Sequence, residues 1–582
     1  MSNTTPGATP DKDATKRKTA GGCNPRASSA KGGKMRKRTT KVIHHANRYE
    51  QFDEAFLRYL GRYLPGFKGH AKDVRLALCG MIYEAPTRYR AHSHHEGYSR
   101  FTWQELEQSF GRKGFTGINQ SLGLFEVLHD AGREDWSVVE GRTKAYMLTK
   151  KVSDIRANFL KGCFRRKPTK LLMRDGKELQ SLPASAMAAK NKDGQNRRGF
   201  QNLPVSTLVP VNLVQIKKLM VNIEARLLAH DAGFVQVELL SEVPNTKFLK
   251  SLHEDAAMIV CKARSKNWPG FVLHRYFEIE SGRVYADGVG NLQNCYRVLR
   301  EAAMAGLYDV DIENCHYSIL AQMAASSGYQ CTAVLDYLSN KKAVRESLAT
   351  EFGISTRQAK DALIALIYGA KFSGREEDAL PKIFNSTKLA ARIYKHPKFL
   401  ALQNDITGAR QAVLAAQPVT RQTIKNCRGL VMRLAGSNER QQLAHLLQGV
   451  EVTALEAAYR LYPNEIVLLQ HDGFAATCPL DTKRIEQAML GATGYRLEVE
   501  QKVIQVNLGD AFDAHPHNTN NQIDKLPFFQ WQRADLTHPL RVNTSIPSLP
   551  HCIHAPAALP AVYVQANVEV IHTALSSVSK TA

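Results

Sequence analysis

The sequence lacks any long hydrophobic run. None of its 582 residues lies in a stretch that approaches about 18 uninterrupted apolar residues, the length that a membrane-spanning helix needs. Its polar N-terminus also lacks the apolar core of a signal peptide. We therefore expect no membrane partner. The expected location is the cytoplasm, at the nucleoid in a bacterial or phage setting, with nuclear and organellar locations left open.

The ten cysteines form no CxxC pair and no spaced quartet, which argues against a disulfide framework or a zinc ribbon and predicts scattered thiols in a reducing compartment. Acidic residues are fewer than basic ones: the chain has 54 Asp and Glu and 78 Lys and Arg, which gives a net charge of +24. This excess predicts a polyanionic partner. Nucleic acid is favoured over a membrane surface because no basic amphipathic anchor stands out.

Changes in composition divide the chain into regions, and its length predicts two to four folded domains. Residues 1–41 contain eleven Lys or Arg and only two acidic residues among Ser, Thr and Gly. That composition has too little apolar surface to fold, so we expect a disordered basic tail. At the other end, residues 514–582 are rich in Pro, His, Asn and Thr without periodicity, and we expect an irregular appendage.

Residues 42–150 predict a small domain that begins with helices and continues with strands. Two short helices, broken at a glycine, precede the alternating segment WSVVEGRTKAYMLTK, with Gly141 and Arg142 at its turn. Two helices and a basic hairpin are typical of a winged helix, a fold that often binds a DNA groove. A small structural domain fits the pattern equally well. Residues 151–255 are a basic linker followed by a helical region.

Residues 256–513 predict an α+β fold and contain four segments suited to chemistry. The first, ESGRVYADGVGNLQN, is rich in turns and exposes Arg283. The second, GLYDVDIENCHYSIL, begins with an alternating strand. Because side chains two apart in a strand point the same way, Asp309 and Asp311 should share one face.

The other two segments follow in order along the chain. TRQAKDALIALIYGAKFSG has helical periodicity, which places Lys360, Ile364 and Tyr368 on one face at i, i+4 and i+8. LLQHDGFAATCP predicts a buried hairpin with Asp472 at its tip, and the helix before it contains Gln448. Each segment alone is a weak signal, whereas all four in this order are hard to obtain by chance.

Together the segments resemble the polymerase family that contains bacterial DNA polymerase I and the single-subunit phage-type RNA polymerases. SGRV…NLQN is similar to the segment before the palm, DIENCH to motif A, KDALIALIYG to the motif B helix, and QG…LLQHDGF to motif C. The similarity covers residues 281–508. It implies a right-hand fold with palm and fingers in 256–513 and thumb-like helices in 151–255.

The resemblance implies a nucleotidyltransferase that acts as a monomer on a template, a primer and nucleoside triphosphates. It also implies two Mg²⁺ ions, with Mn²⁺ as an alternative. Two-metal nucleotide addition needs a few carboxylates, because water and phosphate oxygens complete the coordination of Mg²⁺. The expected metal ligands are Asp311, Asp472 and the backbone carbonyl of Ile312, with Asp309 as the second choice.

Further site residues follow from matched positions. Lys360 would contact the triphosphate and stabilise its charge, as would Arg357, although the DNA branch places this arginine four residues before the lysine rather than three. Tyr368 would stack near the nascent base pair, and Gly369 would let the template backbone come close. The residues expected at primer and template are Arg283, Asn291, Gln293, Gln448 and His471.

The product could be DNA or RNA. Five residues after Asp311, where the DNA polymerases of the family have a glutamate that blocks the sugar 2′-hydroxyl and the RNA branch a glycine, this chain has His316. Its ring is bulky enough to exclude a hydroxyl but is also able to hydrogen-bond one. Ile364 favours RNA, whereas NLQN and the compact spacing favour DNA. We expect DNA synthesis; the alternatives are RNA synthesis and a non-catalytic DNA-binding replication initiator.

Removal of residues 1–41 should weaken DNA binding and make it less dependent on salt. Each Lys or Arg that contacts a phosphate releases counterions from the DNA, so a chain with fewer such contacts releases fewer of them. Titration of duplex DNA at several salt concentrations, with the full chain and the truncated chain, measures both effects. An unchanged salt slope would show that the tail contributes nothing to binding.

Overall fold

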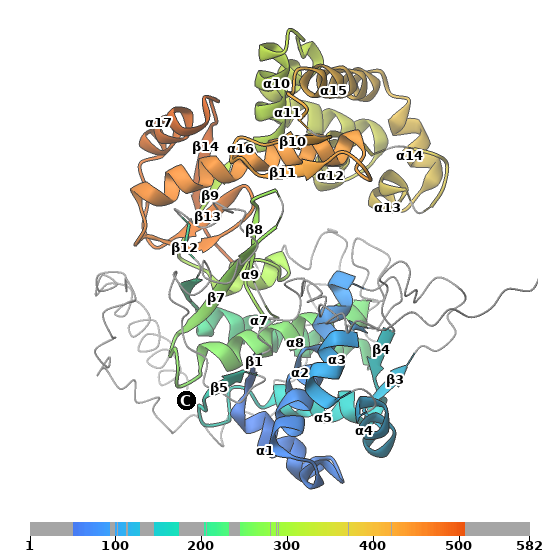
Figure 1. Ribbon diagram of the computed structural model, residues 1–582, viewed down its shortest axis with the longest axis vertical. Helices are drawn as coiled ribbons and strands as arrows, with labels where there is room; N and C mark the ends of the chain where they lie inside the picture. The colour runs from blue at the N-terminus through green and yellow to red at the C-terminus, as the bar shows by residue number, and fades with distance from the viewer. Residues whose placement is uncertain are drawn as a thin grey trace, which may run out of the picture. The chain divides into compact units, whose positions relative to one another are not determined.

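A computed structural model describes residues 51–506 of the chain, apart from gaps at residues 93–98, 102, 112–113, 128–144, 174–202, 205, 232–244, 280, 287, 289, 371, 377 and 421. Three predictions fall outside the described residues: the tail at 1–41, the hairpin turn at Gly141 and Arg142, and the appendage at 514–582. The described residues form an α+β protein, as predicted (Figure 1). None of their helices combines the length and the apolar character needed to cross a membrane.

The central sheet has four strands in the order β12-β13-β9-β14, all paired antiparallel. Strands β12 (IVLL) and β13 (GFAA) are buried along their whole length, which explains their apolar sequences. Strand β9 lies between β13 and β14, so its residues are fixed from both sides. The strands are β9 (Tyr308–Ile312), β12 (Ile466–Leu469), β13 (Gly473–Ala476) and β14 (Val499–Val503).

Helix α16 (Glu439–Leu461) is the longest helix beside this sheet and packs against three others (Figure 1). It begins at a capping box, in which the Asn438 and Gln441 side chains each bond to the other residue's backbone. Most of its residues from Leu443 to Ala458 are buried. Its neighbours are α10 (Cys315–Ser326), α15 (Pro397–Ala415) and α17 (Thr482–Thr493).

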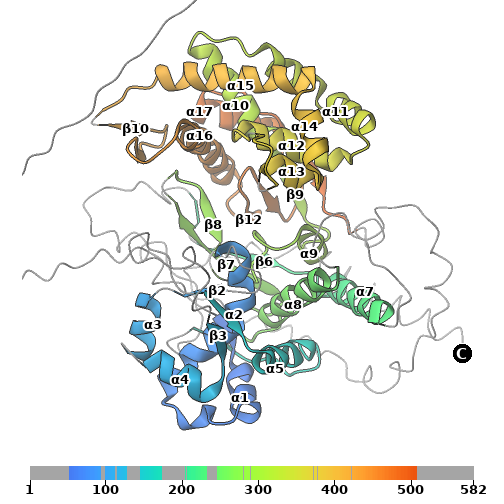
Figure 2. The ribbon, with the colours of Figure 1, turned by 90° about the vertical axis from the view of Figure 1, so that its right-hand side faces the viewer.

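A group of helices between β9 and α16 packs around α12 (Figure 2). Helix α12 (Thr356–Ile367) starts at a capping box of Ser355 and Gln358. It ends at Tyr368 and Gly369, whose φ of 77° requires a residue without a side chain. The other members are α11 (Thr332–Phe352), α13 (Ala379–Phe384) and α14 (Thr387–Tyr394), and the hairpin of β10 (Thr423–Lys425) and β11 (Val431–Arg433) follows α15.

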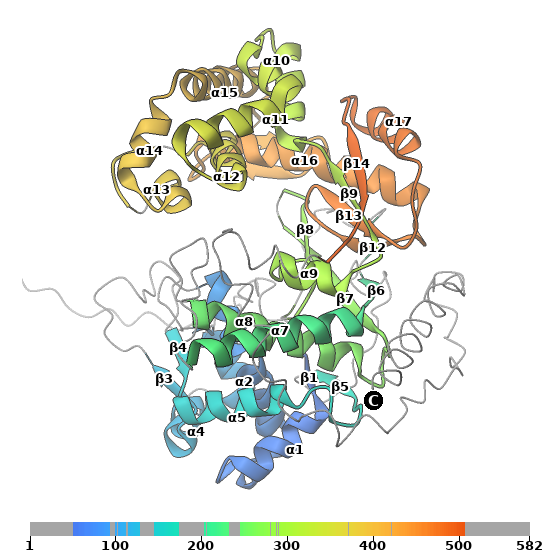
Figure 3. The ribbon, with the colours of Figure 1, turned by 180° about the vertical axis from the view of Figure 1, so that it is seen from behind.

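Two long helices, α7 and α8, lie side by side (Figure 3) and connect β6 to β7 of a second sheet, which has the order β6-β7-β8. Strand β8 begins directly after Arg283, so this sheet sets the position of that side chain. The bounds are β6 (Ser206–Pro210), α7 (Leu213–Asp231), α8 (Asn245–Ala263), β7 (Phe271–Glu278), β8 (Val284–Ala286) and α9 (Arg297–Ala303).

The N-terminal elements include a three-stranded sheet with the order β2-β4-β3. Two helices, α3 and α4, connect β2 to β3, and aromatic rings of Phe101, Phe115, Phe125 and Tyr146 pack together between helix and sheet. The elements are β1 (Gln51–Asp53), α1 (Glu54–Tyr63), a 3-10 turn at Phe67–Gly69, α2 (Lys72–His92), β2 (Ser99–Arg100), α3 (Trp103–Phe110), α4 (Gly114–Leu122), β3 (Phe125–Val127), β4 (Ala145–Leu148), α5 (Lys150–Lys161) and β5 (Leu171–Met173).

Gly473→Ala should destabilise the central sheet. A β-carbon at this position would lie 2.3 Å from the backbone oxygen of Val310, so β13 would have to move away from β9. Overpacking of this kind typically costs about 1–3 kcal/mol. Thermal unfolding measures the change, and Gly491→Ala in α17 is the matched control, because its β-carbon would meet nothing within 4 Å. Equal midpoints for the two variants would contradict the tight fit.

Candidate functional site

Asp311 and Asp472 meet at one end of the central sheet. Asp311 lies on β9 directly opposite Gly473 of β13. Asp472 is the last residue of the turn before β13, and its backbone carbonyl accepts a 2.8 Å hydrogen bond from the N–H of Ile312. The structure therefore brings together the two aspartates that the sequence singled out, from neighbouring strands.

The electrostatics of the pair show how close the two carboxylates are. Burial, together with the neighbouring carboxylates of Asp472 and Asp309, raises the pKa of Asp311 to about 7, against an opposing effect of the Lys360 ammonium. Asp472 reaches solvent, but surrounding protein atoms limit its hydration, and this desolvation raises its pKa, as does the nearby Glu451 carboxylate. Two like charges in such surroundings disfavour full ionisation of the pair.

This donor set fits Mg²⁺. Among the described residues no group of three or more His, Cys, Asp or Glu side chains is arranged to hold a metal ion. A pair of carboxylates is nevertheless sufficient where water and phosphate oxygens complete the octahedron. Asp311 and Asp472 could hold the ion, and Ile312, at the end of β9, places its backbone beside Asp472.

Asp309 shares the face of β9 with Asp311 but has protein partners of its own. Its carboxylate accepts a 3.2 Å hydrogen bond from the Gln470 amide and lies 3.5 Å from the Lys502 ammonium. These contacts leave it less available to a cation than Asp311.

Helix α12 presents one exposed face toward the aspartates. Lys360, Ile364 and Tyr368 are all exposed, as their spacing predicts. The positive charge of Lys360 is near enough to Asp311 to lower the pKa of this carboxyl group. Arg357, one turn earlier, is also exposed and lies 3.8 Å from Asp361 on its own helix.

Gly369 comes directly after Tyr368 at the end of α12, and its backbone has the left-handed conformation. A β-carbon there would lie 2.5 Å from the side chain of Arg440 in α16. In this structure the absence of a side chain at Gly369 therefore lets α16 approach the end of α12.

A polar cluster surrounds the buried side chain of Glu451, and we call it the Glu451 cluster: Glu451, Arg283, His316 and the exposed Tyr368. Glu451 of α16 is fully buried. Arg283 donates from Nε to its Oε1 at 2.8 Å and also contacts its Oε2 through Nη2. The Nε2 atom of His316 lies 2.8 Å from Oε2, and the Tyr368 hydroxyl is 2.8 Å from His316 Nδ1.

Glu451 carries its charge in this cluster. Burial alone would raise its pKa, but the contacts with His316 and Arg283 outweigh burial and lower it. The sequence patterns did not single out this residue. The available signal was an acidic residue inside the apolar run LLQGVEVTAL, one helical turn after Gln448.

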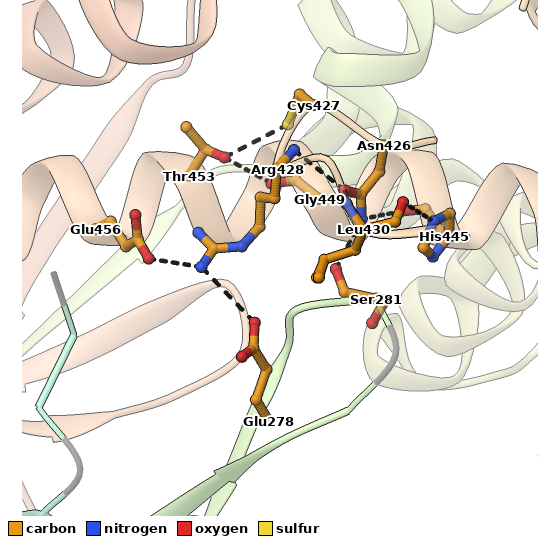
Figure 4. Close-up of polar contacts among 10 residues, drawn as sticks. All are labelled: Glu278, Ser281, Asn426, Cys427, Arg428, Leu430, His445, Gly449, Thr453 and Glu456. Carbon is orange, nitrogen blue, oxygen red and sulfur yellow. Dashed lines mark hydrogen bonds and ion pairs between the residues drawn. The ribbon is translucent and has the colours of Figure 1, made fainter. Parts of the chain in front are cut away.

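The segment before Arg283 is held by the β10–β11 hairpin (Figure 4). The Asn426 amide donates to the backbone carbonyl of Ser281 at 2.9 Å. Next to it, Arg428 forms a separate buried ion pair, with Nη2 2.7 Å from Glu456 of α16 and 3.7 Å from Glu278 of β7 (Figure 4). The hairpin thereby ties Arg283's segment to α16.

Two residues expected at primer and template have internal roles instead. Asn291 and Gln293 are buried. The Gln293 amide donates to the Leu469 carbonyl at 2.9 Å and accepts from the Ala286 N–H at 2.6 Å, while Asn291 donates to the Gly288 carbonyl at 2.6 Å. Their amides satisfy backbone groups of the loop and join it to β12, so we no longer place them at a ligand.

His471 and Gln448 lie at the border of the site. Burial and the charge of Arg283 lower the pKa of His471 to about 4, so its ring is neutral near pH 7. The centroid of the His471 ring lies 4.7 Å from the centroid of the Tyr285 ring, so the two rings pack together. Gln448 is half-buried on α16, one turn before Glu451.

Asp311→Asn should stabilise the metal-free protein at pH 8. The pKa of Asp311 is raised from 3.8 to about 7, so between these pH values the folded protein binds more protons than the unfolded chain. The free energy of unfolding then falls as pH rises through this range and stays low above it. Asparagine does not ionise, so the variant should not lose this stability as pH rises. Thermal unfolding of both proteins from pH 4 to 8 measures the difference.

Added Mg²⁺ should raise the unfolding midpoint of the wild type more than that of Asp311→Asn, because binding to the folded state stabilises it. Asp309→Asn is the matched control: it removes a carboxylate from the same strand face but leaves the pair intact. A metal-free Asp311→Asn variant with a lower unfolding midpoint than the wild type at pH 8 would contradict the expected gain in stability.

No protein-family model matches the chain, and no curated protein is significantly similar to it in sequence.

Proposed function

We propose that the chain is a template-directed nucleic-acid polymerase that adds nucleotides to a 3′-hydroxyl by a two-metal mechanism, with DNA as its product. One observation carries the proposal: Asp311 and Asp472 meet at the end of a buried sheet, and the positive charge of Lys360 on α12 is near enough to lower the pKa of Asp311. Phosphoryl transfer requires this combination, because its catalysis consists almost entirely of positioning and charge stabilisation.

Each residue then has a role that its position supports. Asp311 and Asp472 would hold two Mg²⁺ ions, which when bound activate the primer oxygen and neutralise the triphosphate. Lys360 would bind the triphosphate on the side away from β9. Tyr368, exposed at the end of α12, would pack against the nascent base pair. Arg283 would contact the primer beside it.

In this proposal the sheet β12-β13-β9-β14 is the palm, helices α11 to α14 are the fingers, and the paired helices α7 and α8 are thumb-like. The order of the elements along the chain supports the assignment. Arg357 would support Lys360 at the triphosphate, and Gln448 and His471 would line the template side. Ile364, exposed between Lys360 and Tyr368, would face the nucleotide.

A DNA-binding replication initiator is the second candidate, and one observation favours it. The elements α2, β2, α3, α4, β3 and β4, with the strand order β2-β4-β3, follow the arrangement of a winged helix. Helix α4 exposes Thr116, Gly117 and Gln120 without any charge. Short polar side chains and glutamine amides on such a helix can read base edges in the major groove.

Asp472→Asn should reduce incorporation by at least about 100-fold, as expected when a group that stabilises transition-state charge is lost. Its affinity for primed DNA should stay close to that of the wild type, because Lys and Arg contacts with phosphates dominate binding. Primer extension with Mg²⁺ and labelled dNTPs or NTPs, beside a binding titration, measures both.

Retention of more than a tenth of the wild-type rate in Asp472→Asn would remove this residue from the chemistry. Tight DNA binding by the wild type without incorporation under Mg²⁺ or Mn²⁺ would favour the initiator instead.

A further inference from the structure

Both ring nitrogens of His316 are engaged by protein atoms. Nδ1 lies 2.8 Å from the Tyr368 hydroxyl, and Nε2 lies 2.8 Å from Oε2 of Glu451. The Nε2 atom is buried against the carboxylate without an aligned hydrogen bond, and Nδ1 is hydrogen-bonded to the tyrosine hydroxyl. Neither nitrogen is therefore accessible to a ligand.

Glu451 is held so firmly that it cannot release the ring. Its side chain is fully buried on α16. Arg283 contacts both carboxylate oxygens, in the fork geometry that makes Arg–carboxylate pairs strong and directional. Turning away from His316 would also break this pair and leave a buried charge without a partner.

We infer that Glu451 is a specificity-determining residue: by holding the buried Nε2 side of His316, it leaves the ring no accessible donor or acceptor for a ribose 2′-hydroxyl, and the substrates are therefore 2′-deoxyribonucleoside triphosphates. The inference rests on the proposed function and adds to it that His316 lies beside the sugar of the nucleotide, the position that the polymerase resemblance implies. The carboxylate comes from α16, a different segment from the one that follows β9. It acts through the histidine and is thus a positioning residue.

The physical basis is an unpaired polar group. A ribose hydroxyl pressed against the engaged ring would lose its bonds to water and gain none from protein, whereas a deoxyribose has no hydroxyl to satisfy. Leaving one such group unpaired supports a discrimination of roughly 10- to 100-fold. If Glu451 were removed, Nε2 would become available and the penalty on ribose would fall.

Glu451→Gln is the test, because it keeps the volume of the side chain and removes the charge that fixes His316. We expect the ratio of kcat/KM for dNTPs to kcat/KM for NTPs on a primed template to fall by about tenfold. A purely structural role would lower both values together and leave their ratio unchanged.

Glu456→Gln is the matched control. Glu456 lies on the same helix, is also buried, and is ion-paired to Arg428 rather than to His316 (Figure 4). Its loss should lower the unfolding midpoint as a broken buried ion pair does, while the sugar ratio stays within about twofold of the wild type. An equal fall of the ratio in both variants would overturn the specific role of Glu451.

Tyr368→Phe is a second test that does not disturb the buried charge. It frees Nδ1 of His316 from an exposed residue, so it should fold normally and also lower the ratio. A wild type that uses NTPs as well as dNTPs, or an unchanged ratio in both Glu451→Gln and Tyr368→Phe, overturns the inference. A wild type that incorporates neither kind of nucleotide overturns the proposed function itself.

Discussion

Two carboxylates held side by side are the constraint on which the site depends. In water Asp311 and Asp472 would repel each other and separate, but β9 is fixed between β13 and β14 and cannot yield. The pKa values of both residues are raised, first by burial and then by neighbouring carboxylates: Asp472 and Asp309 act on Asp311, and Glu451 acts on Asp472. Protonation of Asp311 relieves the cost of its ionisation, and a cation bound between the two carboxylates would do the same.

Behind this pair, charge is balanced inside the protein. Arg283 and His316 surround Glu451, and Arg428 lies between Glu456 and Glu278. Both groups link α16 to other segments: Arg283 directly precedes β8, His316 lies on α10, and Glu278 lies on β7. Helix α16 thus supports the site through directional contacts as well as through apolar packing, which fixes side-chain positions more sharply than packing alone.

Local periodicity predicted the parts of the site that depend on a single element. Alternation placed Asp309 and Asp311 on one face of β9, and helical spacing placed Lys360, Ile364 and Tyr368 together on α12. The structure agrees on both. Their catalytic roles, in contrast, came from a resemblance and stay predictions.

What sequence alone did not reveal depends on contacts between distant segments. Glu451 looks like an isolated acid in a helix until Arg283 and His316 are seen beside it. Asn291 and Gln293 look free in a polar loop, yet burial turns their amides inward. Neither burial nor pairing across the fold has a local signature.

The joining of Arg283, His316 and Glu451 has a consequence for how this protein can diverge. Replacing one of the three leaves a buried charged or polar group without its partner, so a change at one position is costly unless the others change too. Homologous chains should therefore show these positions as a covarying set, altered together or not at all.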